Sequence, residues 1–105
     1  MVISWAYLYG QPGADPLADR FVIERGGQRT TLVPVPDESA AAEIAVELIA
    51  EGVELLELCG GFSLTEAARV VEAVGGRVPV GHVNFGLESV AGAAAYKARF
   101  EAQTS

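Results

Sequence analysis

The stretch VELLELCGGFSLTE (residues 53–66) carries the clearest fold signal in this sequence, because it joins a strand to a helix through a glycine turn. Residues 53–59 form a short apolar run that is typical of a buried strand. Gly60 and Gly61 end this run, and Ser63 with Glu66 forms a capping box that begins a helix. A strand that leads directly into a helix predicts an α/β fold with parallel strands.

The segments on either side of this stretch continue the same alternation. Upstream, residues 37–50 predict an amphipathic helix that Asp37 caps and Gly52 ends. Downstream, the helix that Ser63 begins is expected to end at Gly75 and Gly76. Residues 78–85 then predict a strand, and residues 88–102 predict an alanine-rich terminal helix.

The amino-terminal third predicts two more strands with a short helix between them. Residues 2–9 (VISWAYLY) are rich in β-branched and aromatic residues, which indicates a strand. The pair Asp15-Pro16 is a helix-start signal and predicts a helix over residues 16–24. Residues 29–36 predict a second strand, and Pro34, which lacks an amide donor, favours an edge position for it.

Together these elements predict a small four-stranded, mainly parallel sheet with the order β-α-β-α-β-α-β-α. This order is typical of a flavodoxin-like fold or of half a (βα) barrel. A single domain is expected over residues 1–105, with residues 88–105 as a terminal helix whose end is frayed. Four strands leave apolar surface uncovered, so we expect a homo-oligomer, most simply a dimer, that pairs through sheet edges or sheet faces.

Composition excludes several classes of partner. The formal net charge of −7 disfavours binding to nucleic acid or to anionic lipid surfaces. No apolar run approaches the ~20 residues of a membrane span, and no basic segment precedes an apolar stretch at the amino terminus, so a cytoplasmic protein is expected. One His and one Cys are too few soft ligands for a metal site, and none is predicted.

Polar side chains interrupt two predicted strands at positions where a parallel sheet covered on both faces is normally apolar. Alternation places Glu57 and Cys59 on one face of their strand, and His82 and Asn84 on one face of the next. If the two strands are neighbours, these four side chains meet at the carboxyl end of the sheet. Open α/β sheets bind ligands at this end.

The residue types in this group suit proton transfer. A carboxylate beside an imidazole predicts Glu57 and His82 as a general acid–base pair, and Cys59 is a candidate nucleophile. Each residue also has a structural alternative: Glu57 as an exposed carboxylate at a strand end, His82 as a histidine bonded to a backbone carbonyl, and Cys59 as a small buried hydrophobe. For Asn84, the choice is between orienting a substrate and capping a loop.

The glycine turn and the first strand complete the predicted site. Free amides at Gly60, Gly61 and Ser63 would favour an anion or a developing oxyanion at the helix start. The glycine spacing matches neither the dinucleotide fingerprint nor a P-loop, and no cofactor is predicted. Trp5 and Tyr7 share one strand face and would form either an apolar wall of a substrate pocket or part of a core or interface.

The segments VELLELCGGF (53–62), RVPVGHV (77–83) and GADP (13–16) resemble a family of short bacterial proteins whose function is unknown. The resemblance covers residues 1 to about 85, and the Glu-Leu-Cys-Gly-Gly-Phe stretch that begins at Glu57 is its most specific part. It implies a small α/β domain in which Glu57, Cys59 and the two following glycines belong to the family pattern. His82 and the segment from Asn84 onward depart from that pattern.

Three functions are compatible with these features. The first is a cofactor-independent acid–base enzyme, of the isomerase, cyclase or dehydratase type, that acts on a carbonyl-containing small molecule such as a biosynthetic intermediate. The second is a non-catalytic module that holds an anionic metabolite at the glycine turn. The third is a structural subunit whose aromatic sheet face packs against a partner protein.

Overall fold

The computed structural model describes residues 1–104. Within them lies a five-stranded sheet in the order β2-β3-β1-β4-β5. Strands β3, β1, β4 and β5 run parallel, and β2 pairs antiparallel with β3. The strands are β1 (Ile3–Gly10), β2 (Phe21–Arg25), β3 (Gln28–Val35), β4 (Leu56–Leu58) and β5 (Val80–His82). The helices are the short 3-10 helix η1 (Glu38–Ala40), α1 (Ala41–Ala50), α2 (Leu64–Val74) and α3 (Leu87–Thr104).

The predicted α/β class with a mainly parallel sheet is confirmed, but the predicted strand count is wrong because the first helix does not form. The carboxylate of Asp15 does accept the amides of Leu17 and Ala18, at 2.8 and 3.0 Å, but these bonds close only a turn. Residues 21–25 instead form β2. Gly26 and Gly27 adopt φ values of 60° and 77°, which is the geometry of a two-residue hairpin turn, so the apolar segment before them pairs with β3.

The predicted edge position of the strand that contains Pro34 is also wrong, because β2 lies outside β3. The last pair between the two strands joins Phe21 to Leu32. Pro34 therefore lies beyond the hairpin, where β2 needs no amide from it.

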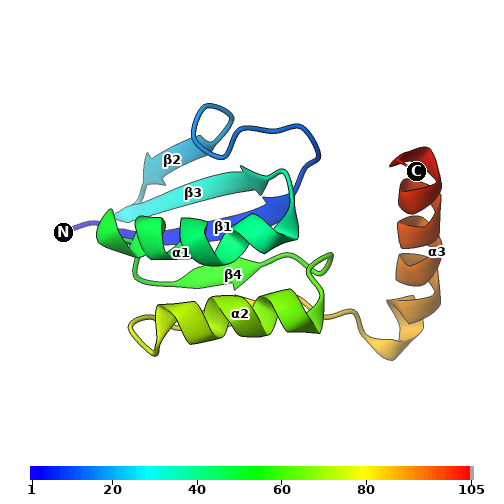
Figure 1. The fold of residues 1–105 in the computed structure, drawn as a ribbon. Coiled ribbons are helices and arrows are strands. Elements are labelled where there is room, and N and C mark those ends of the chain that lie inside the picture. The colour runs from blue at the N-terminus through cyan, green and yellow to red at the C-terminus, as the bar shows by residue number, and fades with distance from the viewer. Residues whose placement is uncertain (105) are drawn as a thin grey trace.

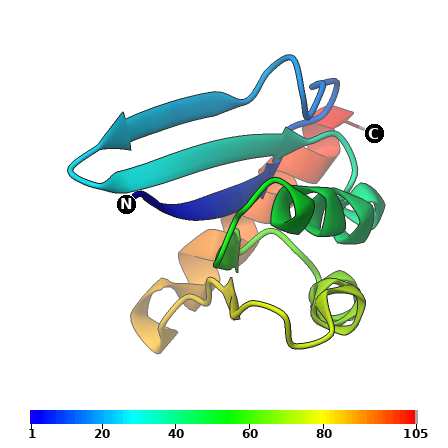
Figure 2. The same cartoon turned by 90° about the vertical axis from the view of Figure 1, so that its left-hand side faces the viewer.

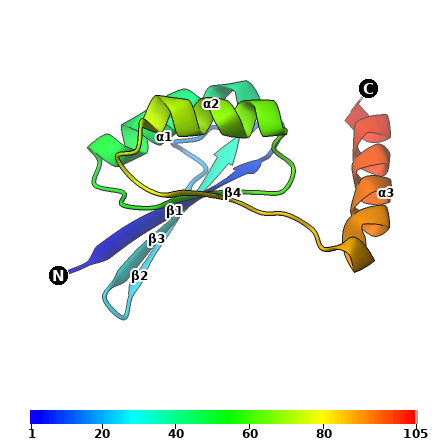
Figure 3. The same ribbon diagram turned by 90° about the horizontal axis from the view of Figure 1, so that it is seen from below.

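Helices α1 and α2 both cover the same face of the sheet (Figure 3). The crossovers from β3 to β4 and from β4 to β5 step in the same direction across the sheet, and right-handed crossovers then place both helices on one side. The core lies between these two layers. Its largest members, all no more than 1% exposed, are Leu8, Val33, Val35, Leu48, Leu56, Leu58, Val70 and Val74.

No helix within residues 1–104 covers the opposite face of the sheet, which we call the open face (Figures 2 and 3). The step from β1 to β3 runs in the other direction, so a helix in that connection would lie on this side. The chain uses the β2 hairpin there instead. By the strand register, the open face carries Ile3, Trp5, Tyr7 and Tyr9 of β1, Phe21 and Ile23 of β2, Thr30 and Leu32 of β3, and Glu57 of β4.

Helix α3 stands apart from these layers, beyond the carboxyl ends of the strands (Figure 1). Between residues 87 and 103, every residue except Ala93 is exposed. The radius of gyration is 14.3 Å, against about 12.9 Å for a compact domain of this length. The terminal helix predicted over residues 88–105 is thus present, but residue 105 and the fraying expected there lie outside the described residues. No helix within residues 1–104 is long and apolar enough to span a membrane.

Candidate functional site

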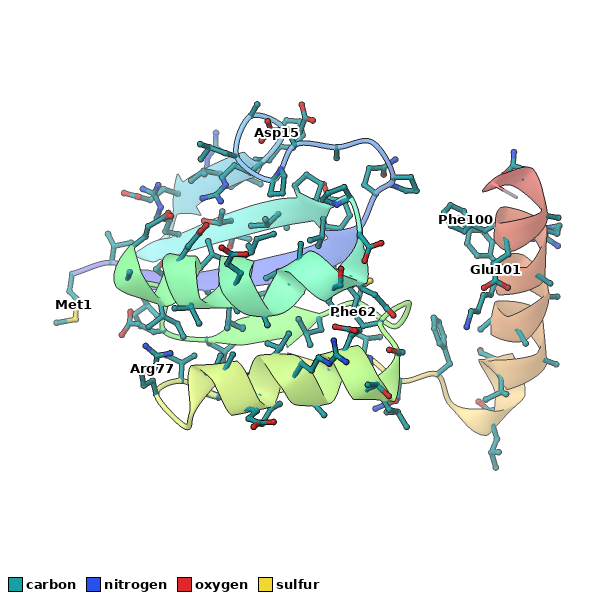
Figure 4. The ribbon with its side chains drawn as sticks, viewed as in Figure 1. Met1, Asp15, Phe62, Arg77, Phe100 and Glu101 are labelled. Carbon is teal, nitrogen blue, oxygen red and sulfur yellow. The ribbon has the colours of Figure 1, made fainter. Side chains whose placement is uncertain are left out.

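A cavity of about 800 Å³ opens at the carboxyl ends of the parallel strands, and we call it the carboxyl-edge cavity. The chain leaves β1 toward β3 and leaves its neighbour β4 in the opposite direction, toward β5. The gap between β1 and β4 is therefore the switch point of the sheet, where open α/β sheets bind ligands. Helix α3 forms the far wall, from which Phe100 and Glu101 project toward the body that contains Phe62 (Figure 4). The lining comprises residues 10–12, 35–38 and 59–63, Phe85, and on α3 Ala93, Ala94, Tyr96, Lys97, Phe100 and Glu101.

The charged residues around the carboxyl-edge cavity are mostly acidic. Asp37, Glu38 and Glu101 line it, with Lys97 as the one cation among the lining residues. The carboxylate of Asp37 accepts the hydroxyl and the amide of Ser39, at 2.7 and 2.8 Å, and these bonds lower the pKa of Asp37 below its ordinary value. The rim is therefore negative at neutral pH.

The amino end of α2 was a predicted anion site, and a carboxylate of the chain itself occupies part of it. The hydroxyl of Ser63 accepts the amide of Glu66 at 3.1 Å, which confirms the predicted cap. The amide of Ser63, however, donates to Oε2 of Glu38 at 3.0 Å, while the carboxylate of Glu66 pairs with Arg69 at 3.2 Å. The capping box is therefore completed by a residue 25 positions away.

The glycine turn after β4 has a packing role as well as free amides. A Cβ atom at Gly60 would lie 2.8 Å from Cε2 of Phe85 and 3.3 Å from the carbonyl oxygen of Val83, so the turn needs glycine where the chain leaving β5 passes. The amides of Gly60 and Gly61 have no hydrogen-bond acceptor among residues 1–104. These two amides remain the available donors at the turn.

The predicted meeting of Glu57 with His82 is wrong, because the register places them on opposite faces of the sheet. Strands β4 and β5 are parallel neighbours, which meets the condition for this prediction, but Glu57 pairs with Gly81 and Leu58 pairs with His82. Paired residues point to the same face. Glu57 therefore lies on the open face, and His82 lies on the face that the helices cover.

His82 and Asn84 both bond to the backbone of nearby loops. Nε2 of His82 lies 3.1 Å from the carbonyl oxygen of Phe62, just before α2. Nδ2 of Asn84 donates to the carbonyl oxygen of His82 at 3.2 Å. These are the bonds that the structural alternatives, a histidine bonded to a backbone carbonyl and a loop-capping amide, lead one to expect.

A different polar group surrounds Glu57 on the open face, and we call it the Tyr7–Glu57–Cys59 cluster. Tyr7 pairs with Glu57 across β1 and β4, and its ring stacks on that of Tyr9 with 6.3 Å between the ring centroids. Burial, followed by the nearby Cys59 and Glu57, raises the pKa of the Tyr7 phenol above its ordinary value. The phenol is therefore protonated at neutral pH, and the half-buried Glu57 carboxylate receives no hydrogen bond from residues 1–104.

Cys59 is the link between this cluster and the carboxyl-edge cavity. It is a partly buried free thiol at the end of β4, and it also lines the cavity. Trp5 and Tyr7, predicted as a pocket wall, lie on the open face and do not line the cavity. Alternation along each strand predicts which neighbours in the sequence share a face with Tyr7 or with Glu57. It does not predict that Tyr7 and Glu57 lie opposite each other, because that depends on the register between β1 and β4.

A smaller cavity of about 500 Å³ lies at the amino ends of the strands. Its charged side chains pair with each other, Arg20 with Glu51 at 3.2 Å and Arg29 with Glu24 at 3.3 Å. Within residues 1–104, no group of three His, Cys, Asp or Glu side chains is arranged to hold a metal ion. The carboxyl-edge cavity and the neighbouring cluster are therefore the main candidate site.

Fold and site together define a small two-layer α/β domain with a ligand-sized cavity at the switch point of its sheet. The chain belongs to the family of unknown function DUF6506, which matches residues 3–98. The match extends past residue 85, where the resemblance drawn from the sequence ended, and includes most of α3. No curated protein and no solved structure shows significant similarity to the chain.

Proposed function

We propose that this protein binds a neutral small molecule with a largely apolar body and a carbonyl group, and that the carboxyl-edge cavity is its site. The observation that carries the proposal is the composition of the cavity wall. It combines aromatic rings from Phe62, Phe85 and Tyr96 with the amides of Gly60 and Gly61, which have no acceptor among residues 1–104. Ligand sites are typically concave and mostly apolar, with a few polar groups that orient the ligand.

Two features favour a neutral ligand over the anionic metabolite that the glycine turn alone predicts. Asp37 and Glu38 make the rim acidic on the side of the sheet, so a carboxylate or phosphate would be repelled there. The amide of Ser63 is already taken by Glu38. A carbonyl oxygen, by contrast, accepts hydrogen bonds from the two glycine amides without bringing a charge.

Two probes with the same aromatic body test this charge preference. Benzylacetone ends in a methyl ketone, and hydrocinnamate ends in a carboxylate of similar shape. Each is titrated into the ¹⁵N-labelled full chain while the amide resonances are followed by NMR. We expect benzylacetone to shift the resonances of Gly60 and Gly61 and hydrocinnamate to shift them less. Equal or stronger binding of the carboxylate, or no shift with either probe, would contradict the proposal.

A matched pair of glycine variants shows whether the probe enters the cavity. Gly10 lines it and Gly92 does not, and a Cβ atom at either position meets no atom within 4 Å. Gly10→Phe should therefore place a ring in the cavity and weaken benzylacetone binding, while Gly92→Phe should leave it unchanged. If both variants bind the probe as well as the original chain does, the cavity is not the site.

Acid–base catalysis is a second candidate function. It would take place on the open face, outside the carboxyl-edge cavity, where Tyr7 and Glu57 share a rung. The Glu57 carboxylate would take the proton from a carbon next to a carbonyl group. The Tyr7 phenol, which is protonated at neutral pH, would donate a hydrogen bond to the oxygen that becomes negative. In this assignment Tyr7 replaces His82 as the partner of Glu57, because His82 lies on the other face.

Deuterium exchange tests this second function separately from binding. Benzylacetone is incubated with the protein in D₂O, and loss of the proton signals next to the carbonyl is followed by NMR. We expect exchange above the buffer rate, loss of that excess in Glu57→Gln and a slower rate in Tyr7→Phe. Glu72→Gln, at an exposed position of α2, is the control. Exchange at the buffer rate would rule out this chemistry on this probe and leave a binding module.

A further inference from the structure

The open face is apolar to a degree that is unusual for a surface in contact with water. Ile3, Phe21 and Ile23 are 59%, 66% and 54% exposed, and the rings of Trp5 and Tyr7 are half-buried beside them. Apart from Glu57, the only charged strand residue that the register places on this face is Arg25, at the end of β2. The net charge of −7 is therefore carried almost entirely by other surfaces.

The position of this apolar surface within the sheet adds a second argument. Trp5, Tyr7 and Tyr9 occupy alternate positions on the open face of β1, and we call them the aromatic file. Strand β1 is the middle strand of the five. Mainly parallel sheets are normally covered on both faces, and helices α1 and α2 cover only one face here. The place that is normally the most buried in such a sheet is thus left half-exposed.

The chain exposes more surface than a compact domain of its mass does. A compact protein of 11.0 kDa exposes about 5,600 Å², whereas this chain exposes 6813 Å². The excess of about 1,200 Å² belongs to the whole chain, which includes helix α3, where every residue from 87 to 103 except Ala93 is exposed. A standard interface buries about 800 Å² on each partner, which is less than this excess.

We propose that a second copy of this chain covers the open face, with the two sheets packed face to face about a twofold axis and the aromatic file of β1 at the centre. Aromatic residues are enriched, and charged residues depleted, in the buried centre of interfaces. The indole N–H of Trp5 already donates to the hydroxyl of Thr30 at 2.7 Å, so covering Trp5 leaves no unsatisfied donor.

Pairing through the sheet edges is the less favourable alternative. The edge strand β5 has only three residues and follows Pro79, and the other edge strand, β2, ends in Glu24 and Arg25. Short length, proline and charge are the features by which natural sheets prevent edge pairing.

The second copy would cover Tyr7, which belongs to the aromatic file, whereas Glu57 lies on β4 at the border of the apolar area. This interface is therefore an alternative to acid–base catalysis at Tyr7 and Glu57, which needs an accessible open face. The proposed interface does not depend on the proposed ligand and holds whether or not a small molecule binds.

The test measures the mass of the full chain in solution and compares two matched variants. We expect light scattering after size exclusion to give twice the chain mass of 11.0 kDa. Ile23→Asp places a charge on the open face, and Val71→Asp does the same on α2 at a position with similar exposure, 52%. Ile23→Asp should weaken the dimer by about 100-fold or more, since the substitution occurs twice in a symmetric interface, and Val71→Asp should not.

A second measurement needs no variant and therefore stands even if Ile23→Asp fails to fold. Trp5 is the only tryptophan, so its fluorescence reports on the open face alone. Dilution of the original chain should shift the emission to longer wavelength over the same concentration range in which the mass halves. A monomer at all concentrations, a dimer that Ile23→Asp leaves intact, or dissociation without a change in Trp5 emission would each overturn the proposal.

Discussion

Glu38→Ala tests whether the carboxylate of the chain itself occupies the amino end of α2. The substitution removes the acceptor of the Ser63 amide, a bond of 3.0 Å. A hydrogen bond to a charged group contributes about 1.5–3 kcal/mol, and a negative charge at a helix start contributes about 0.3–1 kcal/mol. Because Glu38 is only partly buried, the lower ends of these ranges apply, and we expect a loss of about 1–2 kcal/mol in the free energy of unfolding.

Thermal unfolding followed by circular dichroism measures this loss. In a domain of this size a loss of 1–2 kcal/mol lowers Tm by about 4–16 °C. Glu47→Ala is the control, because Glu47 is exposed on α1 and the change in charge is the same. Its effect should stay within about 0.5 kcal/mol. Equal Tm values for the two variants would refute the inference that Glu38 stabilises the start of α2.

Added sulfate makes the same test sharper. An anion should bind the amide that Glu38→Ala leaves free, so sulfate should raise the Tm of this variant more than that of Glu47→Ala. The general stabilising effect of sulfate acts on both variants and cancels in the comparison. An equal rise in both would show that the amino end of α2 is not the site that Glu38 fills.

Three further predictions concern the core, His82 and Tyr7. Leu58→Ala, at a fully buried position of β4, should lower the free energy of unfolding by about 2–5 kcal/mol, as measured by urea denaturation. A loss below about 1 kcal/mol would contradict the burial of Leu58 in the core. His82→Ala should lower the free energy of unfolding by about 1 kcal/mol, because the hydrogen bond to the carbonyl oxygen of Phe62 is lost. The variant should keep any deuterium exchange of the ketone. Loss of exchange with unchanged stability would indicate that His82 is a catalytic residue. The pKa of the Tyr7 phenol is raised in the folded state, so the phenol ionises first in the unfolded chain. The free energy of unfolding should therefore fall as the pH rises above 10.0, and it should fall less steeply in Tyr7→Phe. Parallel pH profiles of the two proteins would contradict the raised pKa.

The elements whose signals are local could be predicted from the sequence alone. The helix over residues 37–50 appears as η1 and α1, and α2 lies between its cap at Ser63 and Gly75, whose φ of 63° ends it. The parallel direction of β4 and β5 was also predictable, because a helix connects the two strands. Periodicity, caps and glycine stops act within a few residues of the chain, so one sequence is enough to read them.

The features that depend on residues far apart in the chain could not be predicted from local signals and are set by the folded sheet. Residues 21–25 became a strand because β3 offered a pairing partner, although Asp15-Pro16 signals a helix. The register of β4 placed Glu57 on the open face beside Tyr7 and away from His82. Because side chains alternate with a period of two, a shift of one residue in register moves a side chain to the other face of the sheet, and no local pattern in either strand specifies that shift.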